Sequence, residues 1–316
     1  MKIIGTGSAH PKKVVTNKML EEFLDTTDEW ITTRTGISER RLISSEALED
    51  IATVACNKAL ESANVKAEDI DFLICSNVVN EFVTPALGCV IQGMIGAKCP
   101  TIDVNGACAG FVYALDIAES YFNTKPEINH ILVIAAEEPA RMVGWNERAN
   151  CVLFGDGAGA VVLSRGDNFK SFRFSTTSKY QSLYQKRRLQ PTPFVTKEEP
   201  DGPLIMNGRD IFKLAVEASQ VDVKFVLDKA GVHEDEISYY ILHQANTRII
   251  DSIRNFLNQS PEKFPMNIQH YGNTSSASIP ILLDEMNREG KLKEGQYIVL
   301  SAFGAGFTTG ACLLKW

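Results

Sequence analysis

One cysteine stands where a thiol could act as a nucleophile. Cys108 lies in Asp103–Leu115, where an apolar strand runs through a tight turn of small residues into a helix. The first N–H groups of a helix and its dipole favour a thiolate, so we expect the pKa of the Cys108 thiol to fall. The neighbours Ala107, Ala109 and Gly110 leave room for a substrate carbonyl. Taken alone, a cysteine among small residues is more often an inert core residue.

Two further segments carry polar side chains where an apolar stretch meets a helix. In Tyr239–Ile250 an apolar strand ends at His243 and a helical period follows, which is a common place for catalytic groups on α/β sheets. In Tyr271–Pro280 a turn of small residues opens a helix and contains Asn273. Each residue alone has a plainer interpretation, as a core histidine satisfied by the backbone and as a helix N-cap.

Together, Cys108, His243 and Asn273 are the parts of a decarboxylating condensing enzyme. The cysteine would carry an acyl group as a thioester, while the imidazole and the amide each donate a hydrogen bond to a developing enolate oxygen. Over nearly its whole length the chain closely resembles the β-ketoacyl-[acyl-carrier-protein] synthase III family of the thiolase superfamily. The resemblance rests on ordered motifs at Ile3–Ser8, Asp28–Ile37, Cys108–Phe111, Phe154–Ala160, His243–Asn246, Gly272–Ser275 and Phe303–Thr308.

The resemblance implies a ping-pong reaction with two half-reactions. An acyl-CoA primer would acylate Cys108; malonyl-acyl-carrier protein would then lose carbon dioxide and attack the thioester. The product would be a 3-oxoacyl-acyl-carrier protein, which initiates fatty acid synthesis. The implied oxyanion hole consists of the backbone N–H groups of Cys108 and Ala305. The family commonly has glycine in place of Ala305, so this position must adopt a φ that suits a residue with a Cβ. The resemblance implies no metal and no cofactor besides the acyl-CoA substrate.

Binding residues carry over from the family at matching positions. Trp30 and Arg148 match the family positions that sandwich the adenine of CoA between an indole and a guanidinium group. Arg34 lies in the same motif as Trp30 and is also expected to bind CoA. A basic patch for the acidic carrier protein is expected at Lys213, Arg248 and Arg254. Such rim charges act mainly on encounter, and solvated surface charges without a partner are the alternative.

The acyl pocket is expected to include Phe303 and Thr84. Thr84 precedes Pro85 and matches a residue that the partner subunit of a family homodimer places at the floor of the acyl tunnel. Acetyl-selective members often have a bulky phenylalanine there, so the smaller threonine predicts primers longer than acetyl. If the alignment shifts by a residue, Phe82 would plug the tunnel instead.

Composition sets limits on the class of protein. With 316 residues, 44% of them hydrophobic, the chain can bury a large core. A net charge of -7 argues against a general nucleic-acid surface, and no apolar run approaches the length of a membrane span. The start of the chain predicts a strand and a turn, not a signal peptide. Seven cysteines without metal-ligand spacing indicate a reducing cytoplasm.

Two pairs of similar segments indicate an internal repeat, which predicts two similar α/β halves, residues 1–165 and 166–316. Lys58–Ile74 resembles Val226–Ile241 as a helix end, a polar turn and a strand, and Val152–Leu163 resembles Leu300–Leu314 as strands broken by a Gly-rich turn. The thiolase-like α/β fold implied by the resemblance is such a duplication, with layers in the order α-β-α-β-α. Residues 166–206 break the pattern and predict an exposed excursion.

Glycine motifs and related enzyme classes offer weaker alternatives. Gly5–Gly7 lacks the third glycine of a dinucleotide fingerprint, and Gly155–Gly159 lacks the helix and lysine of a phosphate loop, so close strand packing explains both better.

Related enzyme classes fit the sequence less well. A thiolase would use a second cysteine as a base, and the segment Ser301–Gly306 contains none. A hydroxymethylglutaryl-CoA synthase would use a glutamate base in the first half and would have no residue equivalent to Asn273. A non-catalytic partner subunit would lack the nucleophile. A specialised paralogue in secondary metabolism, using a longer acyl chain and another acceptor, is the main alternative.

Overall fold

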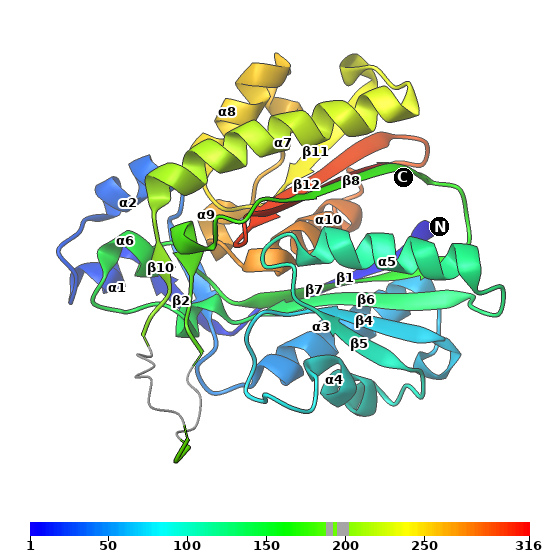
Figure 1. Cartoon of the computed structure of the whole chain (residues 1–316), viewed down its shortest axis with the longest axis horizontal. Coiled ribbons are helices and arrows are strands. Elements are labelled where there is room, and N and C mark those ends of the chain that lie inside the picture. Colours follow the sequence, from blue (N-terminus) through cyan, green and yellow to red (C-terminus); the bar gives the residue numbers. More distant parts are fainter. Residues whose placement is uncertain (188–191, 195–201) are drawn as a thin grey trace.

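Two β-sheets form the framework of the computed structural model, which describes residues 1–187, 192–194 and 202–316 (Figure 1). The larger sheet contains, in order across the sheet, β1 (Lys2–Ala9), β7 (Gly157–Ser164), β6 (His130–Glu137), β4 (Phe72–Ser76) and β5 (Thr101–Val104). The smaller sheet contains, in order, β8 (Phe169–Thr176), β13 (Thr308–Lys315), β12 (Tyr297–Gly304) and β11 (Ile237–Leu242).

The two sheets share a strand pattern. In the series β1-β7-β6-β4 and β8-β13-β12-β11, the second strand is antiparallel to both neighbours and the last two strands are parallel. The expected helix, turn and strand are also present twice, since α3 (Leu48–Ala63) leads to β4 and α7 (Gly208–Ala230) leads to β11. The division into halves at residue 165 stays a prediction.

Helices separate and cover the sheets, as Figure 1 shows. The helices α5 (Gly110–Thr124) and α10 (Ser278–Arg288) lie between the sheets and contact strands of both. On the outer face of the larger sheet lie α3 and α4 (Leu87–Ile95), and over the smaller sheet lie α7 and α8 (Thr247–Leu257). The predicted layer order α-β-α-β-α of a thiolase-like α/β fold is therefore confirmed.

Burial on both faces explains the composition of the central strands. In β6, residues 131–137 are all buried, and β7 is buried up to Leu163. Parallel and mixed sheets covered by helices on both faces need such continuous apolar runs. The core between the sheets joins residues of α5, β6 and α10 with residues of β12 and β13. Strands and helices far apart in the sequence thus share one apolar layer.

Smaller elements from both parts of the chain complete the fold. A hairpin of β2 (Lys13–Thr16) and β3 (Glu39–Leu42) encloses α1 (Asn17–Glu21) and α2 (Asp28–Thr35). The short α6 (Arg148–Cys151) and α9 (Ile268–Tyr271) follow later, and β9 (Leu183–Tyr184) pairs with β10 (Ile205–Met206).

Two sequence expectations about these regions need correction. The segment Val152–Asp156 is not a strand, because the backbone of Leu153 and Gly155 bonds to Asn273 and not to a sheet neighbour. The predicted excursion at 166–206 is shorter than expected, because residues 169–176 form β8 inside the smaller sheet. Within that excursion, residues 188–191 and 195–201 lie outside the described residues.

Close packing, and not ligand binding, explains the glycine motifs. A Cβ on Gly7 would lie 2.2 Å from the carbonyl oxygen of Ala55, so β1 can approach α3 only with glycine there. A Cβ on Gly155 would lie 2.1 Å from the carbonyl oxygen of Tyr271. Both distances are far below van der Waals contact, as expected where backbones approach closely.

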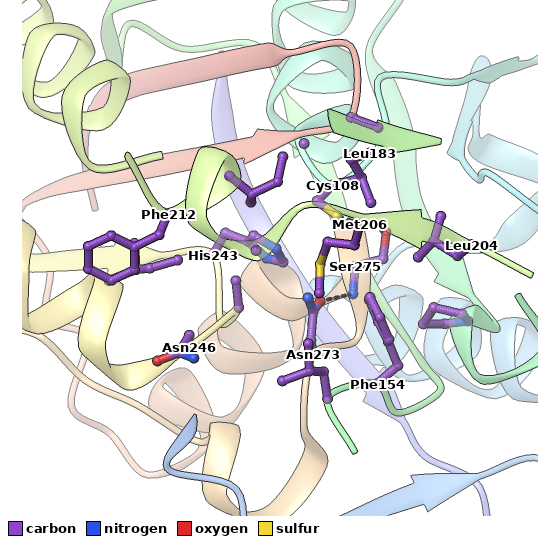
Figure 2. A pocket seen from close by; sticks show the side chains of 18 of the residues that line it. Cys108, Phe154, Leu183, Leu204, Met206, Phe212, His243, Asn246, Asn273 and Ser275 are labelled. Carbon is purple, nitrogen blue, oxygen red and sulfur yellow. Dashed lines mark hydrogen bonds between the residues drawn. The ribbon is translucent and has the colours of Figure 1, made fainter. Parts of the chain in front are cut away.

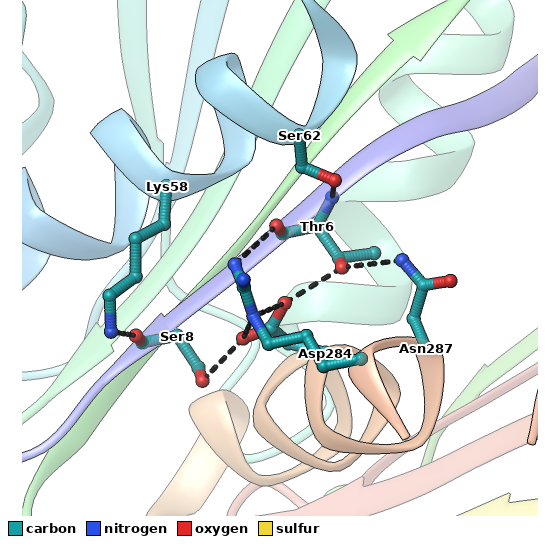
Figure 3. Close-up of polar contacts among 7 residues, drawn as sticks. Thr6, Ser8, Lys58, Ser62, Asp284 and Asn287 are labelled. Atoms are coloured by element: carbon teal, nitrogen blue, oxygen red, sulfur yellow. Dashed lines mark hydrogen bonds and ion pairs between the residues drawn. The ribbon is translucent and has the colours of Figure 1, made fainter. Parts of the chain in front are cut away.

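A buried carboxylate ties the central helix α10 to the larger sheet (Figure 3). Asp284 accepts hydrogen bonds from Thr6 Oγ1 at 2.8 Å and Ser8 Oγ at 2.7 Å on β1, and from Arg288 Nε at 2.9 and 3.0 Å. Only 1% of the Asp284 side chain is exposed. Because buried polar groups are costly without partners, this network fixes the position of α10 along β1.

Replacing Asp284 should destabilise the protein. Asp284→Ala leaves the Thr6 and Ser8 hydroxyls without an acceptor, so we expect the free energy of unfolding to fall by about 2–4 kcal/mol. Denaturant unfolding followed by circular dichroism measures this change. Glu289→Ala is a matched control because Glu289 is half exposed and its carboxylate pairs with the exposed Lys291. It should change the free energy by less than about 0.5 kcal/mol. Equal effects of the two substitutions would contradict the role of Asp284.

Candidate active site

Cys108 lies in the turn that joins β5 to α5. The turn is tight, since Ala107 has a φ of 48° in the left-handed region. Such a conformation costs a residue with a Cβ about 1–3 kcal/mol and is found mainly at functional sites. The Cys108 side chain is partly buried and lines a cavity of about 750 Å³. The turn therefore presents the sulfur to a space large enough for a substrate.

The turn between β12 and β13 packs directly against Cys108. A Cβ on Gly304 would lie 2.5 Å from the backbone nitrogen of Cys108, so only glycine permits this approach. Thr308 Oγ1 donates to the carbonyl oxygens of Gly106 at 3.1 Å and of Ala305 at 3.0 Å, which fixes the two turns to each other. Ala305 lines the cavity and does not have a positive φ, as its Cβ requires.

His243 follows β11 directly, as predicted, and is 2% exposed. Its Nδ1 lies 2.7 Å from Ser278 Oγ at the start of α10, and its ring meets Phe303 edge-on at 5.2 Å. Burial lowers the pKa of His243 to about 3. The imidazole is therefore neutral near pH 7, and one of its two nitrogens carries a hydrogen.

Asn273 lies in the loop before α10 and is not the N-cap of that helix, which is Ala277. Its Oδ1 accepts the backbone N–H of Ser275 at 2.8 Å, while its own backbone bonds to Leu153 and Gly155. The side chain is buried and lines the same cavity as Cys108. Figure 2 shows Cys108, His243 and Asn273 grouped around one part of that cavity.

The expectation of a lowered thiol pKa is wrong. Burial raises the pKa of the Cys108 thiol to about 12; a hydrogen bond from Ser275 opposes this effect and the charge of Glu137 adds to it. A helix N-terminus favours a negative charge by about 0.3–1 kcal/mol, whereas removing a charge from water costs several kcal/mol. Desolvation therefore dominates, and the resting thiol is protonated.

Aromatic and basic side chains lie at the mouth of the cavity. The guanidinium carbons of Arg34 and Arg148 each lie 4.9 Å from the centroid of the Trp30 ring. Arg148 is also held by Asp25, whose carboxylate is 3.7 Å away. Trp30 and Arg34 line the cavity, whereas Arg148 flanks it beyond Ala149. The structure thus brings together the three residues that the sequence assigned to CoA.

The residues expected to bind the carrier protein are more scattered. Arg248 lines the cavity mouth at the start of α8. Lys213 on α7 is exposed and lies 3.9 Å from Glu217, and Arg254 lies 3.2 Å from Asp251.

Of the two expected pocket residues, Phe303 lines the cavity and Thr84 does not. Thr84 is exposed on the surface of the single chain. Next to it on the same loop, 42% of Phe82 and 77% of Val83 are exposed. The structure of one chain therefore leaves the acyl-pocket role of Thr84 untested.

Sequence reasoning missed several polar residues that support the site. Ser278 holds the imidazole of His243, and Ser275 lies 3.4 Å from Cys108 Sγ. Ser275 in turn contacts Glu137, a buried carboxyl group at the end of β6. Glu137 was detectable as a charged residue that ends the apolar run Ile131–Ala136. Arg209 also lines the mouth of the cavity.

The described residues contain neither a cluster of metal ligands nor a helix that could span a membrane. Across residues 1–187, 192–194 and 202–316, no three His, Cys, Asp or Glu side chains cluster in a way that could hold a metal ion. Within the same ranges, no helix has both the length and the apolar character needed to cross a bilayer.

Comparison with known proteins places the chain in a family. Two family models match, "3-Oxoacyl-[acyl-carrier-protein (ACP)] synthase III" over residues 102–179 and its C-terminal counterpart over residues 227–316. The β-ketoacyl-[acyl-carrier-protein] synthase III of Aquifex aeolicus is 44% identical over all of this chain and 99% of the relative, and that of Clostridium acetobutylicum is 40% identical over 100% and 98%.

A solved structure of 3-oxoacyl-[acyl-carrier-protein] synthase III from Aquifex aeolicus is similar throughout. It superposes with a TM-score of 0.93 at 42% identity, covering 100% of this chain and 99% of that chain. Fold, site geometry and sequence relatives agree, and the chain belongs to the β-ketoacyl-[acyl-carrier-protein] synthase III family.

Proposed function

We propose that this protein catalyses the decarboxylating Claisen condensation of an acyl-CoA primer with malonyl-acyl-carrier protein. The product is a 3-oxoacyl-acyl-carrier protein, and the reaction initiates fatty acid synthesis. The observation that carries the proposal is that Cys108, His243 and Asn273 line one cavity in a member of this family. The names of the relatives favour this reaction over the specialised transfers of secondary metabolism.

In the first half-reaction, Cys108 takes the acyl group from acyl-CoA as a thioester and CoA leaves. The tetrahedral oxyanion is held by the backbone N–H groups of Cys108 and Ala305. Support comes from the contact of Gly304 with Cys108 and from Thr308, which fixes the two turns. Preorganised donors of this kind lower the barrier because they need no rearrangement when the charge develops.

In the second half-reaction, malonyl-acyl-carrier protein loses carbon dioxide and the resulting enolate attacks the thioester. We assign the Ser278 hydroxyl as the donor to Nδ1 of His243, because its oxygen already accepts the Gln244 N–H at 3.3 Å. With this assignment Nε2 carries the hydrogen and donates to the enolate oxygen. Asn273 donates through Nδ2, because its Oδ1 already accepts the Ser275 N–H. A neutral imidazole suits this role since it needs no prior protonation at physiological pH.

Substrate binding is assigned to the cavity mouth. Trp30, Arg34 and Arg148 hold the adenine and phosphate groups of CoA through stacking and charge. Support comes from the two guanidinium carbons, each of which lies 4.9 Å from the centroid of the Trp30 ring. An acidic carrier protein docks on the basic residues of α7 and α8, namely Lys213, Arg248 and Arg254. Arg248 is the member of this patch nearest the cavity because it lines the mouth.

A homodimer would explain the exposed apolar loop at Phe82 and Val83 and the exposed Ile102 on β5. β5 is an edge strand of the larger sheet, and edge strands with exposed apolar residues invite pairing with another chain. In such a dimer, Thr84 of one subunit lies at the floor of the acyl tunnel of the other.

Each step above uses groups of this chain and its two substrates, so the proposed mechanism needs no resident cofactor or metal. Nucleic acid and membrane have no role in it. We further propose that the protein works in the cytoplasm, because all seven cysteines are free thiols. Free thiols persist in a reducing compartment.

Separate assays of the half-reactions test the proposed function. His243→Ala and Asn273→Ala should lower malonyl decarboxylation by about 10²–10³-fold, because each removes a donor to the enolate, yet still allow Cys108 acylation. Cys108→Ala should abolish acylation and keep decarboxylation. Radiolabelled acyl-CoA and labelled carbon dioxide measure the two steps, with Glu61→Ala on the exposed face of α3 as the control. Equal loss of both steps in every site variant would contradict the assignment.

Primer choice tests the position of Thr84. The wild-type enzyme should accept acyl-CoA primers longer than acetyl, because each buried methylene contributes about 0.8 kcal/mol. Thr84→Phe should shift kcat/KM toward acetyl-CoA, whereas Thr84→Val keeps the volume and should leave the preference unchanged. Steady-state kinetics with acetyl-, butyryl- and hexanoyl-CoA measure the shift. A wild-type enzyme that uses only acetyl-CoA would refute the open tunnel without affecting the condensing mechanism.

A further inference from the structure

A buried carboxyl group lies one hydroxyl away from the nucleophile. Glu137 ends β6 and is 2% exposed. Its Oε1 accepts hydrogen bonds from Ser276 Oγ at 2.5 Å and Ser275 Oγ at 3.2 Å, and its Oε2 accepts the Val78 N–H at 3.2 Å. These partners in the described part of the chain are hydroxyls and a backbone amide, and none carries a positive charge. A buried carboxyl group in such surroundings favours its protonated form.

Ser275 connects this carboxyl group to Cys108. Its Oγ lies 3.4 Å from Cys108 Sγ as well as 3.2 Å from Glu137 Oε1. Ser275 has a φ of 54°, a left-handed conformation that a residue with a Cβ adopts only when its surroundings hold it. A hydroxyl has one hydrogen and two lone pairs, so it can accept from one neighbour while it donates to the other. Sulfur, hydroxyl and carboxyl group therefore form a continuous hydrogen-bonded chain.

We infer that Glu137 acts through Ser275 as the group that takes up the Cys108 proton and holds it while the acyl group is on the sulfur. This inference rests on the proposed function for its place in the cycle. Ser275 is the residue in contact with the reacting sulfur, and Glu137 is a positioning residue that determines the direction in which the Ser275 hydroxyl donates.

The proton balance of the cycle closes. On acylation the Cys108 S–H bond breaks, its proton passes to Ser275 Oγ, and the former Ser275 proton passes to the Glu137 carboxylate. The thiolate attacks acyl-CoA, and the departing CoA thiolate takes a proton from solvent. After condensation Cys108 leaves the 3-oxoacyl product as a thiolate, and the proton returns to it from Glu137 through Ser275. The overall reaction consumes one solvent proton, as the loss of carbon dioxide from a malonyl carboxylate requires.

The acid–base properties of the neighbours support Glu137 over the imidazole as the proton acceptor. Burial raises the pKa of Glu137 to about 7, whereas burial lowers the pKa of His243 to about 3. At neutral pH the carboxylate is thus the stronger base. Among the described residues, the other titratable groups whose charge interacts with Glu137 are the thiols of Cys108 before α5 and Cys75 on β4.

The pH dependence of Cys108 alkylation tests this inference without the natural substrates. Iodoacetamide is applied between about pH 6 and pH 9, and peptide mass spectrometry follows Cys108, with the exposed Cys89 as an internal reference. In the wild-type protein the rate should rise up to about pH 7 and then level off, because the proton moves internally from Cys108 to Glu137. The plateau should end at higher pH, where direct loss of the thiol proton to solvent supplies more thiolate. In Glu137→Gln the proton must leave to solvent, so the rate should rise about tenfold per pH unit throughout.

Two further variants separate the proton route from structural effects. Ser275→Ala keeps the carboxyl group but breaks the chain, so the rate on the plateau should fall roughly tenfold through loss of a hydrogen bond to the thiolate. Ser276→Ala removes a hydroxyl from the same carboxyl group without breaking the route, and it should retain the plateau. Glu137→Asp should restore part of the plateau.

Parallel wild-type and Glu137→Gln profiles, with the variant faster at every pH, would overturn the inference, since Glu137 would then act only as a nearby negative charge. A wild-type profile without a plateau would overturn it even if the variant failed to fold. A plateau in a protein that acyl-CoA does not acylate would refute the proposed function and leave the proton route standing.

Discussion

The packing of two helices between two sheets is the constraint on which the site depends. Both α5 and α10 are covered by strands, and their buried faces belong to one apolar core. The segments that precede the two helices meet, as the 3.4 Å contact between Ser275 Oγ and Cys108 Sγ shows. Neither helix can move without exposing that core, which is why groups from distant parts of the chain keep fixed positions. The Asp284 network adds a polar anchor along β1.

The same burial sets the chemistry of the site. Desolvation raises the pKa of Cys108 to about 12 and of Glu137 to about 7, and lowers that of His243 to about 3. Removal from water disfavours every charged form, so a thiol, a carboxyl group and an imidazole shift in the directions that keep each neutral. The result is a protonated nucleophile, a basic carboxylate near neutrality and a neutral hydrogen-bond donor. Packing and acid–base roles therefore have one physical cause.

Sequence reasoning found what is local and missed what depends on distant neighbours. Cys108 and His243 were predictable because each follows an apolar strand, and the layer order came from the family resemblance. The direction of the Cys108 pKa was wrong because desolvation comes from elements far away in the sequence. The contact between Ser275 and Glu137 spans 138 positions and has no local pattern. Likewise, Val152–Asp156 shares its pattern with a true strand, but its backbone partner is the Asn273 loop.

The mechanism requires the acyl group to pass through Cys108. Peptide mass spectrometry of the protein after incubation with acyl-CoA alone detects this intermediate. We expect one acyl group per chain, on the peptide that contains Cys108, and we expect it to disappear when malonyl-acyl-carrier protein is added. The exposed Cys89 should stay unmodified. Formation of the 3-oxoacyl product without an adduct on Cys108, or with the acyl group on another residue, would rule out Cys108 as the carrier of the acyl group.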